Sequence, residues 1–154
     1  ESCLEDARAQ GKSGVCLLGA AKQKAWLSDQ SFARKFGFQT VDTAGEYELL
    51  ARSLDGTVPR FAPCAKRQRI EGEELTVYYS DQCPYIPDRV AKLRAYCADK
   101  GISARFLHVE SAEQAKNLPC VFQNWAVFYG GKFVTVNQID GAMLERIRRR
   151  AARG

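Results

Sequence analysis

The chain has 154 residues, of which 45% are hydrophobic, and this is enough apolar material for one packed domain or for two small ones. No apolar run approaches the roughly 18 residues that a membrane helix needs, and no secretory signal opens the chain, so we expect a cytoplasmic protein without a membrane partner. The formal net charge of +5 is modest, and its visible concentration is the arginine-rich tail 146–153. Cations favour the negative end of a helix, and no zinc-finger or RNP-like motif is present, so we do not expect nucleic-acid binding.

Six cysteines could indicate three disulfides, but their spacing is wide and irregular. In a cytosolic context we expect thiols rather than a disulfide framework. The chain has no Cys-x-x-Cys pair and only one histidine, so we expect no metal site. The cysteines are Cys3, Cys16, Cys64, Cys83, Cys97 and Cys120.

The first part of the chain alternates helical and strand patterns. A helix is expected to end at Gly11, and the apolar run 14–19 between glycines suits a strand that is buried on both faces. Ser28 or Asp29 can cap the next helix, 30–36, which would place Phe32, Ala33 and Phe36 on one side. Two strands are then expected at 38–42 and 47–52.

This order of elements resembles the C-terminal half of the GNAT N-acetyltransferase fold, and several stretches are similar to the YoaP-type acetyltransferases. In that family a GNAT domain is followed by a YoaP domain. The stretches that carry the resemblance are Gly14–Leu18, Trp26–Asp29, Phe32, Phe36–Phe38, Val41–Asp42, Tyr47–Leu50, Cys83–Tyr85 and Phe128–Phe133.

The resemblance implies that residues 1–57 are the C-terminal half of an acyltransferase fold, and that acetyl-CoA is the cofactor of a longer protein. The glycine-rich turn that binds the acetyl-CoA pyrophosphate in GNAT enzymes would lie before residue 1. The position of the tyrosine acid that many of these enzymes carry is Ala33. We therefore expect no cofactor for this chain alone, and no acetyl transfer by it.

Residues 58–73 contain two prolines and four cations without a clear period, and we interpret them as a solvated linker rather than a binding patch. Residues 74–154 then show the order β, α, β, short α, proline, β-hairpin, α, which is that of thioredoxin-like domains. The expected elements are strands at 75–79 and 102–109, helices at 88–100 and 111–116, a β region from Leu118 that includes the hairpin 125–136, and a final helix capped by Asp140. The fold class that we expect is therefore α/β, with a partial GNAT-type sheet followed by a thioredoxin- or glutaredoxin-like domain.

Cys83 lies just past a strand and at the start of a helix, where backbone N–H groups and the helix dipole favour a thiolate. With Pro84 and Tyr85 it resembles the glutaredoxin Cys-Pro-Tyr-Cys motif, but Ile86 replaces the second cysteine. A thiolate without a resolving cysteine can attack a disulfide or accept an acyl group. Pro84 and Tyr85 are candidate binding residues, and burial of the Tyr85 ring is the alternative.

Thioredoxin folds carry a cis-proline that faces the cysteine and precedes the hairpin strand, and Pro119 is the candidate for it. Cys120 follows Pro119 and is the candidate partner thiol, although packing in the core is the competing interpretation. We interpret His108 as a strand histidine whose polar atoms are satisfied, rather than as a catalytic base.

Three functions remain open from the sequence. The first is an acyl-CoA-dependent acyltransferase whose C-terminal domain is accessory. The second is a one-cysteine thiol-redox or thiol-binding module, and the third is a docking or dimerisation element. The expected substrate is a small molecule or a thiol, and the sequence indicates no oligomeric state.

Overall fold

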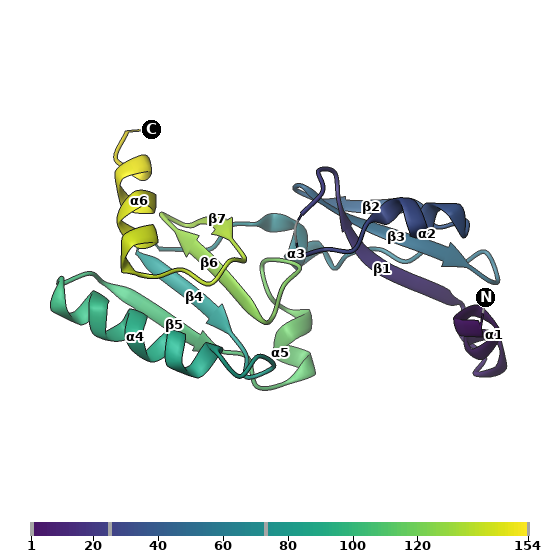
Figure 1. Ribbon diagram of the computed structural model, residues 1–154, viewed down its shortest axis with the longest axis horizontal. Coiled ribbons are helices and arrows are strands. Elements are labelled where there is room, and N and C mark those ends of the chain that lie inside the picture. The colour runs from purple at the N-terminus through teal and green to yellow at the C-terminus, as the bar shows by residue number, and fades with distance from the viewer. Residues whose placement is uncertain (1, 25, 73, 154) are drawn as a thin grey trace. The chain divides into compact units, whose positions relative to one another are not determined.

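A computed structural model describes residues 2–24, 26–72 and 74–153 (Figure 1). The chain is mixed α/β with two sheets, and it divides into two compact units, residues 1–66 and 67–154.

The first unit contains a three-stranded antiparallel sheet of order β1-β3-β2. The central strand, β3, contributes buried residues to the core of this unit. Leu50 is fully buried, and Tyr47, Leu49 and Ala51 of the same strand are also buried. The elements are α1 (Ser2–Ala9), β1 (Gly14–Ala20), α2 (Gln30–Lys35), β2 (Gln39–Ala44) and β3 (Tyr47–Ser53), and α3 (Pro63–Arg67) lies at the boundary between the units.

The apolar run at 14–19 forms β1, but the expectation that this strand is buried on both faces was wrong. Cys16 is exposed, and residues 14, 15, 17 and 18 are only half-buried. The reason is topological, since β1 pairs only with β3 and is an edge strand of the sheet among the described residues.

Helix α2 begins after Asp29, whose carboxylate accepts a hydrogen bond from the Ser31 backbone N–H at 2.8 Å. Its predicted apolar side is only partly used. Ala33 is buried, but Phe32 is 69% exposed and packs on the ring of Phe36, with ring centroids 4.9 Å apart. Ala33 is the buried residue of this six-residue helix.

The segment predicted as a solvated linker contains the boundary between the two units, and its residues 60–66 make contacts with the first unit. The Phe61 backbone N–H and the Lys66 ammonium both contact the carboxylate of Asp42, at 2.8 and 2.6 Å. The hydrogen bond from Lys66 is the main cause of the lowered pKa of Asp42. Arg60 also donates to the Val41 carbonyl at 2.7 Å. Two cations of this segment, Arg60 and Lys66, therefore make contacts that hold it to the first unit.

Residues 68–70 are tied to the second unit by backbone hydrogen bonds. The Gln68 N–H donates to the Pro119 carbonyl at 3.0 Å, and the Ile70 N–H donates to the Gly131 carbonyl at 2.9 Å. Arg69 forms an isolated β-bridge with Lys132. The chain therefore enters the second unit along its hairpin.

The second unit is built on a four-stranded sheet of order β5-β4-β6-β7. Strands β4 and β5 are parallel, and β6 and β7 are each antiparallel to the preceding neighbour in the sheet. The elements are β4 (Leu75–Tyr79), α4 (Ile86–Asp99), β5 (Ala104–His108), α5 (Ala112–Lys116), β6 (Trp125–Tyr129), β7 (Lys132–Thr135) and α6 (Gly141–Ala151).

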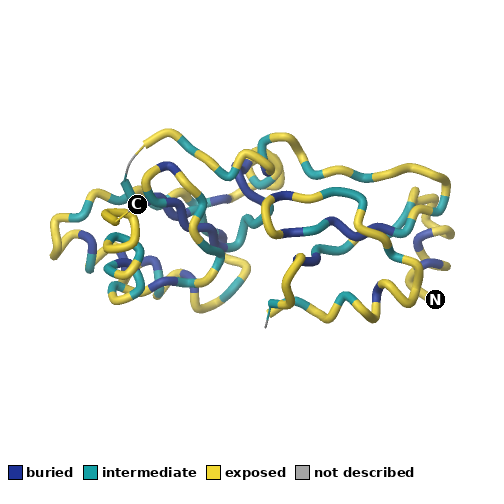
Figure 2. The backbone as a smooth tube through the Cα atoms, turned by 90° about the horizontal axis from the view of Figure 1, so that it is seen from above, coloured by how far each residue is buried: buried dark blue, intermediate teal, exposed yellow. Residues whose placement is uncertain are grey.

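Two hydrophobic clusters cover the two faces of this sheet. The first contains Leu75 and Val77 of β4 with the apolar sides of α4 and α6. The second contains Phe128 with Tyr78 and Ala115. Successive residues of a strand face opposite sides, so β4 and β6 contribute to both clusters. The buried residues of this unit, dark blue in Figure 2, gather around these strands.

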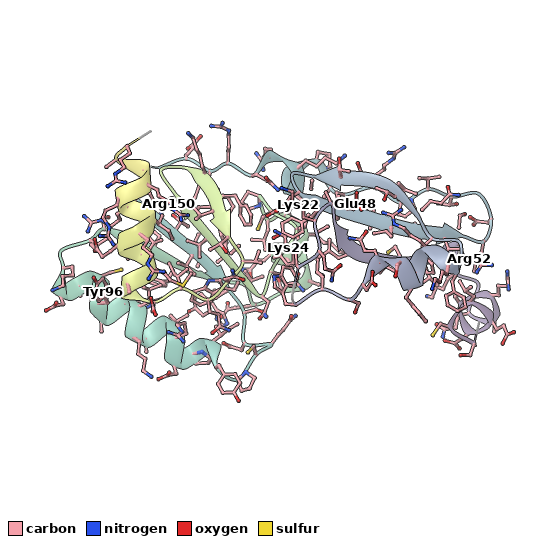
Figure 3. All side chains as sticks on the ribbon, turned by 45° about the horizontal axis from the view of Figure 1, so that its top comes forward. Lys22, Lys24, Glu48, Arg52, Tyr96 and Arg150 are labelled. Atoms are coloured by element: carbon pink, nitrogen blue, oxygen red, sulfur yellow. The ribbon has the colours of Figure 1, made fainter. Side chains whose placement is uncertain are left out.

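Helices α4 and α6 pack together at Tyr96, which is labelled in Figure 3. The Tyr96 hydroxyl lies 3.4 Å from the Glu145 carboxylate. A Cβ atom at Gly141 would come within 2.5 Å of the Tyr96 ring, so only glycine fits beneath it. Asp140 caps α6 by accepting a hydrogen bond from the Met143 N–H at 2.8 Å, as the sequence predicted.

Candidate functional site

Cys83 lies in the turn between β4 and α4. The Ile86 N–H donates to the Cys83 carbonyl at 3.1 Å, and α4 begins at Ile86, two residues earlier than predicted. The cysteine is half-buried, and its side chain packs against the first hydrophobic cluster. It therefore precedes the first helical residue by three positions.

Gln138 places a polar group against this thiol. Its Nε2 atom lies 3.8 Å from the Cys83 sulfur, within hydrogen-bonding range for sulfur, and it comes from the loop between β7 and α6. Sequence reasoning missed Gln138, because 55 residues separate it from Cys83 and no local motif marks it.

Pro84 and Tyr85 are exposed beside Cys83. Tyr85 is 75% exposed, so it is not a core aromatic. It is available at the surface next to the thiol, and its role in binding stays a prediction.

Cys120 is placed away from Cys83. It is buried in the second cluster, on the opposite face of the sheet, and its thiol donates to the Phe122 carbonyl at 3.3 Å. Burial raises the pKa of Cys120 to about 11. This placement favours the core interpretation and disfavours a disulfide between Cys120 and Cys83.

Pro119 also differs from expectation. No peptide bond among the described residues is cis, so the predicted cis bond at Leu118–Pro119 was wrong. The predicted β region from Leu118 is likewise irregular until Trp125. The Pro119 carbonyl is occupied by the hydrogen bond from the Gln68 N–H.

The buried thiol of Cys120 makes stability depend on pH in the alkaline range. Above about pH 9 the unfolded thiol ionises, while the folded thiol keeps its proton until about pH 11. The unfolded state then binds fewer protons, so stability falls as pH rises through this window, by about 2 kcal/mol. We expect Cys120→Ala to flatten this dependence in urea unfolding at pH 8 and 10.5. An equal loss in both proteins would contradict the prediction.

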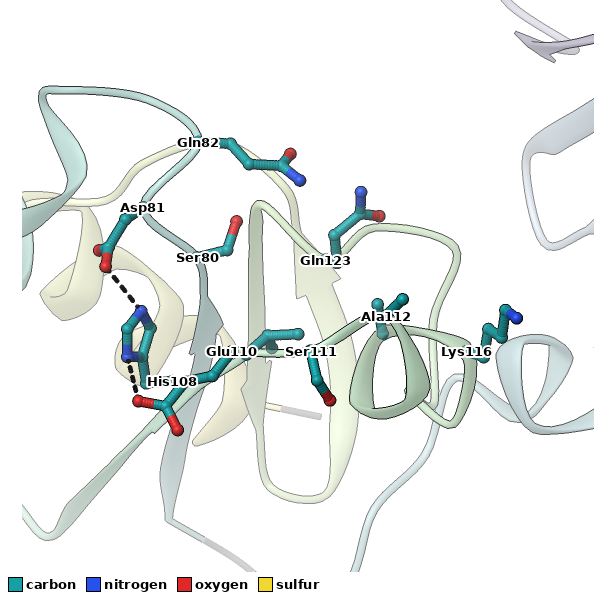
Figure 4. Close-up of a pocket in the computed structure, with 11 residues that line it drawn as sticks. Ser80, Asp81, Gln82, His108, Glu110, Ser111, Ala112, Lys116 and Gln123 are labelled. Carbon is teal, nitrogen blue, oxygen red and sulfur yellow. Dashed lines mark hydrogen bonds and ion pairs between the residues drawn. The ribbon is translucent and has the colours of Figure 1, made fainter.

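A pocket of about 760 Å³ lies at the carboxyl ends of β4 and β5 (Figure 4). Its wall comes from three segments. These are residues 80–82 after β4, residues 108–112 with Ala115 and Lys116 from the end of β5 into α5, and Gln123 before β6. Val109 and Ala115 of the second cluster form its apolar part. Cys83 does not line it.

His108 lies in this pocket between two carboxylates. Its Nε2 atom is 3.0 Å from Asp81, its Nδ1 atom is 3.2 Å from Glu110, and its ring stacks on Tyr79 at 4.8 Å (Figure 4). Both ring nitrogens thus have partners, as expected for a satisfied histidine. The sequence did not indicate the carboxylates, because the crossover from β4 to β5 brings Asp81 to a residue 27 positions away.

Within the described ranges, no group of three or more His, Cys, Asp or Glu side chains could hold a metal ion. No helix among them is long and apolar enough to cross a membrane.

Comparison with known proteins gives two similarities. Residues 104–146 match the model of the YoaP-like family. Over 138 residues, which are 88% of this chain, the sequence is 31% identical to a Bacillus subtilis (strain 168) protein named "Uncharacterized N-acetyltransferase YoaP". The chain covers 55% of that protein, so it spans about half the length of this curated relative. No solved structure matches the chain significantly.

Proposed function

We propose that this chain is the C-terminal part of an acyl-CoA-dependent N-acetyltransferase of the YoaP type, which transfers an acetyl group to a small-molecule substrate. The observation that carries the proposal is the 31% identity over 138 residues to the Bacillus subtilis relative, whose name is that of an N-acetyltransferase. A match confined to one motif would not extend over 88% of the chain.

The first unit supports the acyltransferase assignment through its order of elements. Helix α1, strand β1, helix α2 and the pair β2 and β3 follow the order that the GNAT resemblance predicts for residues 1–57.

The second unit supports an accessory thioredoxin-like domain. Its order of strands and helices from β4 to α6 is the order expected for that fold, and β4 and β5 are parallel, as the crossover between them predicts. Helices α4 and α6 lie on one face of the sheet and α5 on the other. A cytoplasmic location stays a prediction.

Acetyl-CoA does not fit the described residues by themselves. A pyrophosphate needs a glycine-rich turn that opens a helix, whereas Gly11 and Gly14 follow α1. We therefore assign cofactor binding to the longer protein.

The test is a hybrid protein in which this chain replaces the matching region of the Bacillus subtilis relative. CoA release from acetyl-CoA would be followed with a panel of primary amines, for the relative, for the hybrid and for the 154-residue chain. We expect release by the relative and the hybrid and none by the chain. A folded but inactive hybrid beside an active relative, or release by the chain itself, would contradict the proposal.

The contact of Gln138 with Cys83 favours a second function, in which Cys83 acts as a thiol nucleophile. The Cys83 thiolate would attack a low-molecular-weight disulfide, form a mixed disulfide and release the other half as a thiolate. The amide N–H of Gln138 would stabilise the negative charge on the sulfur.

We expect Gln138→Leu to slow alkylation of Cys83 by iodoacetamide at neutral pH by about threefold, because it removes this donor. Mass spectrometry of the Cys83 peptide would follow the reaction, with Gln10→Leu, a substitution in the other unit, as the control. Equal rates in all three proteins would argue against an activated thiol at Cys83.

A further inference from the structure

Ser80 lines the pocket at the carboxyl ends of β4 and β5 and has an unsatisfied polar group. The residue is 5% exposed, and its hydroxyl has no hydrogen-bond partner among the described residues. A buried hydroxyl without a partner is costly, so a ligand group that bonds to Ser80 would remove an existing penalty. Ligands of open α/β sheets bind outside the carboxyl ends of the strands, which is where Ser80 lies.

The charged side chains of this pocket are already engaged. His108 lies between Asp81 and Glu110, at 3.0 and 3.2 Å (Figure 4). Lys116 has an interaction of its own. A charged ligand would compete with these contacts, whereas a neutral ligand would leave them in place.

Neutral hydrogen-bonding groups lie on the side of the pocket to which Ser80 points. Figure 4 shows the Ser80 hydroxyl on the side where the side chains of Gln82 and Gln123 lie. Each of these two side chains ends in an amide, which can donate and accept hydrogen bonds, and a hydroxyl can do both as well. This side of the pocket therefore suits a ligand group that itself has one donor and one acceptor.

The rest of the wall offers small apolar side chains and no free ring. Val109, Ala112 and Ala115 are its apolar residues. His108 carries the only ring among the described residues that line the pocket, and this ring is already stacked on Tyr79 at 4.8 Å. The wall therefore favours a short aliphatic group over an aromatic one, which would need a ring to pack against.

We propose that this pocket binds a neutral aliphatic amide, which is a small molecule with one carboxamide group and a short apolar arm. The Ser80 hydroxyl would donate to the amide carbonyl, and the side-chain carbonyl of Gln123 would accept from the amide N–H. The apolar arm would lie against Val109 and Ala115. The inference does not depend on acyl transfer, because it concerns binding to this chain without acetyl-CoA.

The test uses N-propylacetamide as the probe and chemical-shift changes in the ¹⁵N-labelled 154-residue chain as the readout. We expect shifts at the backbone amides of residues 80, 82, 109 and 123 and at the side-chain amide of Gln123. Propyl acetate has a similar shape but no N–H, and it should bind about fivefold more weakly. Failure of N-propylacetamide to shift these signals, or equal binding of the amide and the ester, would overturn the proposal.

Charged probes test the neutral character of the site. Butylammonium and butyrate should leave the signals of Ser80 and Gln123 unshifted, because a charge placed beside neutral groups loses its hydration without gaining a partner. Raising NaCl from about 50 to 500 mM should change the affinity for N-propylacetamide by less than about twofold, since screening acts on charges. A larger loss of affinity, or shifts of Ser80 and Gln123 by either ion, would contradict a site for neutral ligands.

Substitutions at Ser80 and Gln123 test the two assigned hydrogen bonds. Ser80→Ala and Gln123→Leu should each weaken N-propylacetamide binding by about fivefold. Ser80→Ala should also leave stability unchanged or raise it, because the substitution removes a polar group that lacks a partner in the described chain. Ser28→Ala and Gln10→Leu, at exposed positions of the other unit, are the matched controls. Binding that is unchanged in both pocket variants would refute the site.

Discussion

Replacing Leu75 with alanine should destabilise the second unit by about 2–5 kcal/mol, which is the range for removing a fully buried leucine side chain. Leu75 is completely buried in β4 and belongs to the first hydrophobic cluster, where α4 and α6 cover the sheet. Strand β4 is central, with β5 on one side and β6 on the other, so the surroundings have little freedom to collapse into the cavity.

Leu107→Ala is the matched control for this prediction. Leu107 lies on the neighbouring strand β5 and is 38% exposed, so the same substitution should cost about 1 kcal/mol or less. Urea unfolding would be followed by the fluorescence of Trp125, which is buried in β6, in a Trp26→Phe background. Similar losses for the two leucines would show that the first cluster is not the core of this unit.

Gly131→Ala should destabilise the second unit by about 2–4 kcal/mol, through backbone strain and a steric clash together. The backbone of Gly131 has φ +72°, which L-residues rarely adopt. An added Cβ would lie 2.8 Å from the Ile70 carbonyl oxygen and 3.1 Å from that of Gly72. Both atoms belong to the backbone of the segment that enters this unit, so they cannot rotate away as a side chain would.

Gly130→Ala isolates the clash from the strain. Gly130 has a similar φ of +57°, but a Cβ there would meet nothing within 4 Å. We expect a cost of about 1–2 kcal/mol from conformation alone. The same fluorescence measurement would report both variants, and equal costs would refute the close approach of the entering segment to the hairpin.

Local patterns predicted most of the regular structure. Strand β4 has the predicted bounds because its five consecutive residues are β-branched, aromatic or aliphatic, which is typical of a strand. Asp140 caps α6, as the sequence predicted. Non-local contacts were not predictable in this way. The edge position of β1 and the contacts of residues 60–66 with Asp42 depend on which strands become neighbours.

The candidate site also has features that local sequence predicts and features that only the fold determines. The position of Cys83 between a strand and a helix follows from its immediate neighbours in the sequence. Its relation to Cys120 does not, because the side of the sheet on which a residue lies depends on the course of an irregular segment, here residues 117–124. The pocket also joins residues from three separate segments, and only the fold brings Ser80, His108 and Gln123 together.

We propose that residues 1–66 belong to the acyltransferase part and that the second unit is accessory. The most direct measurement is CoA release by the Bacillus subtilis relative after exchange of only the region that matches residues 1–66. We expect this hybrid to release CoA in the presence of an amine that the unmodified relative also accepts. A hybrid that folds and binds acetyl-CoA but transfers no acetyl group to that amine would contradict it.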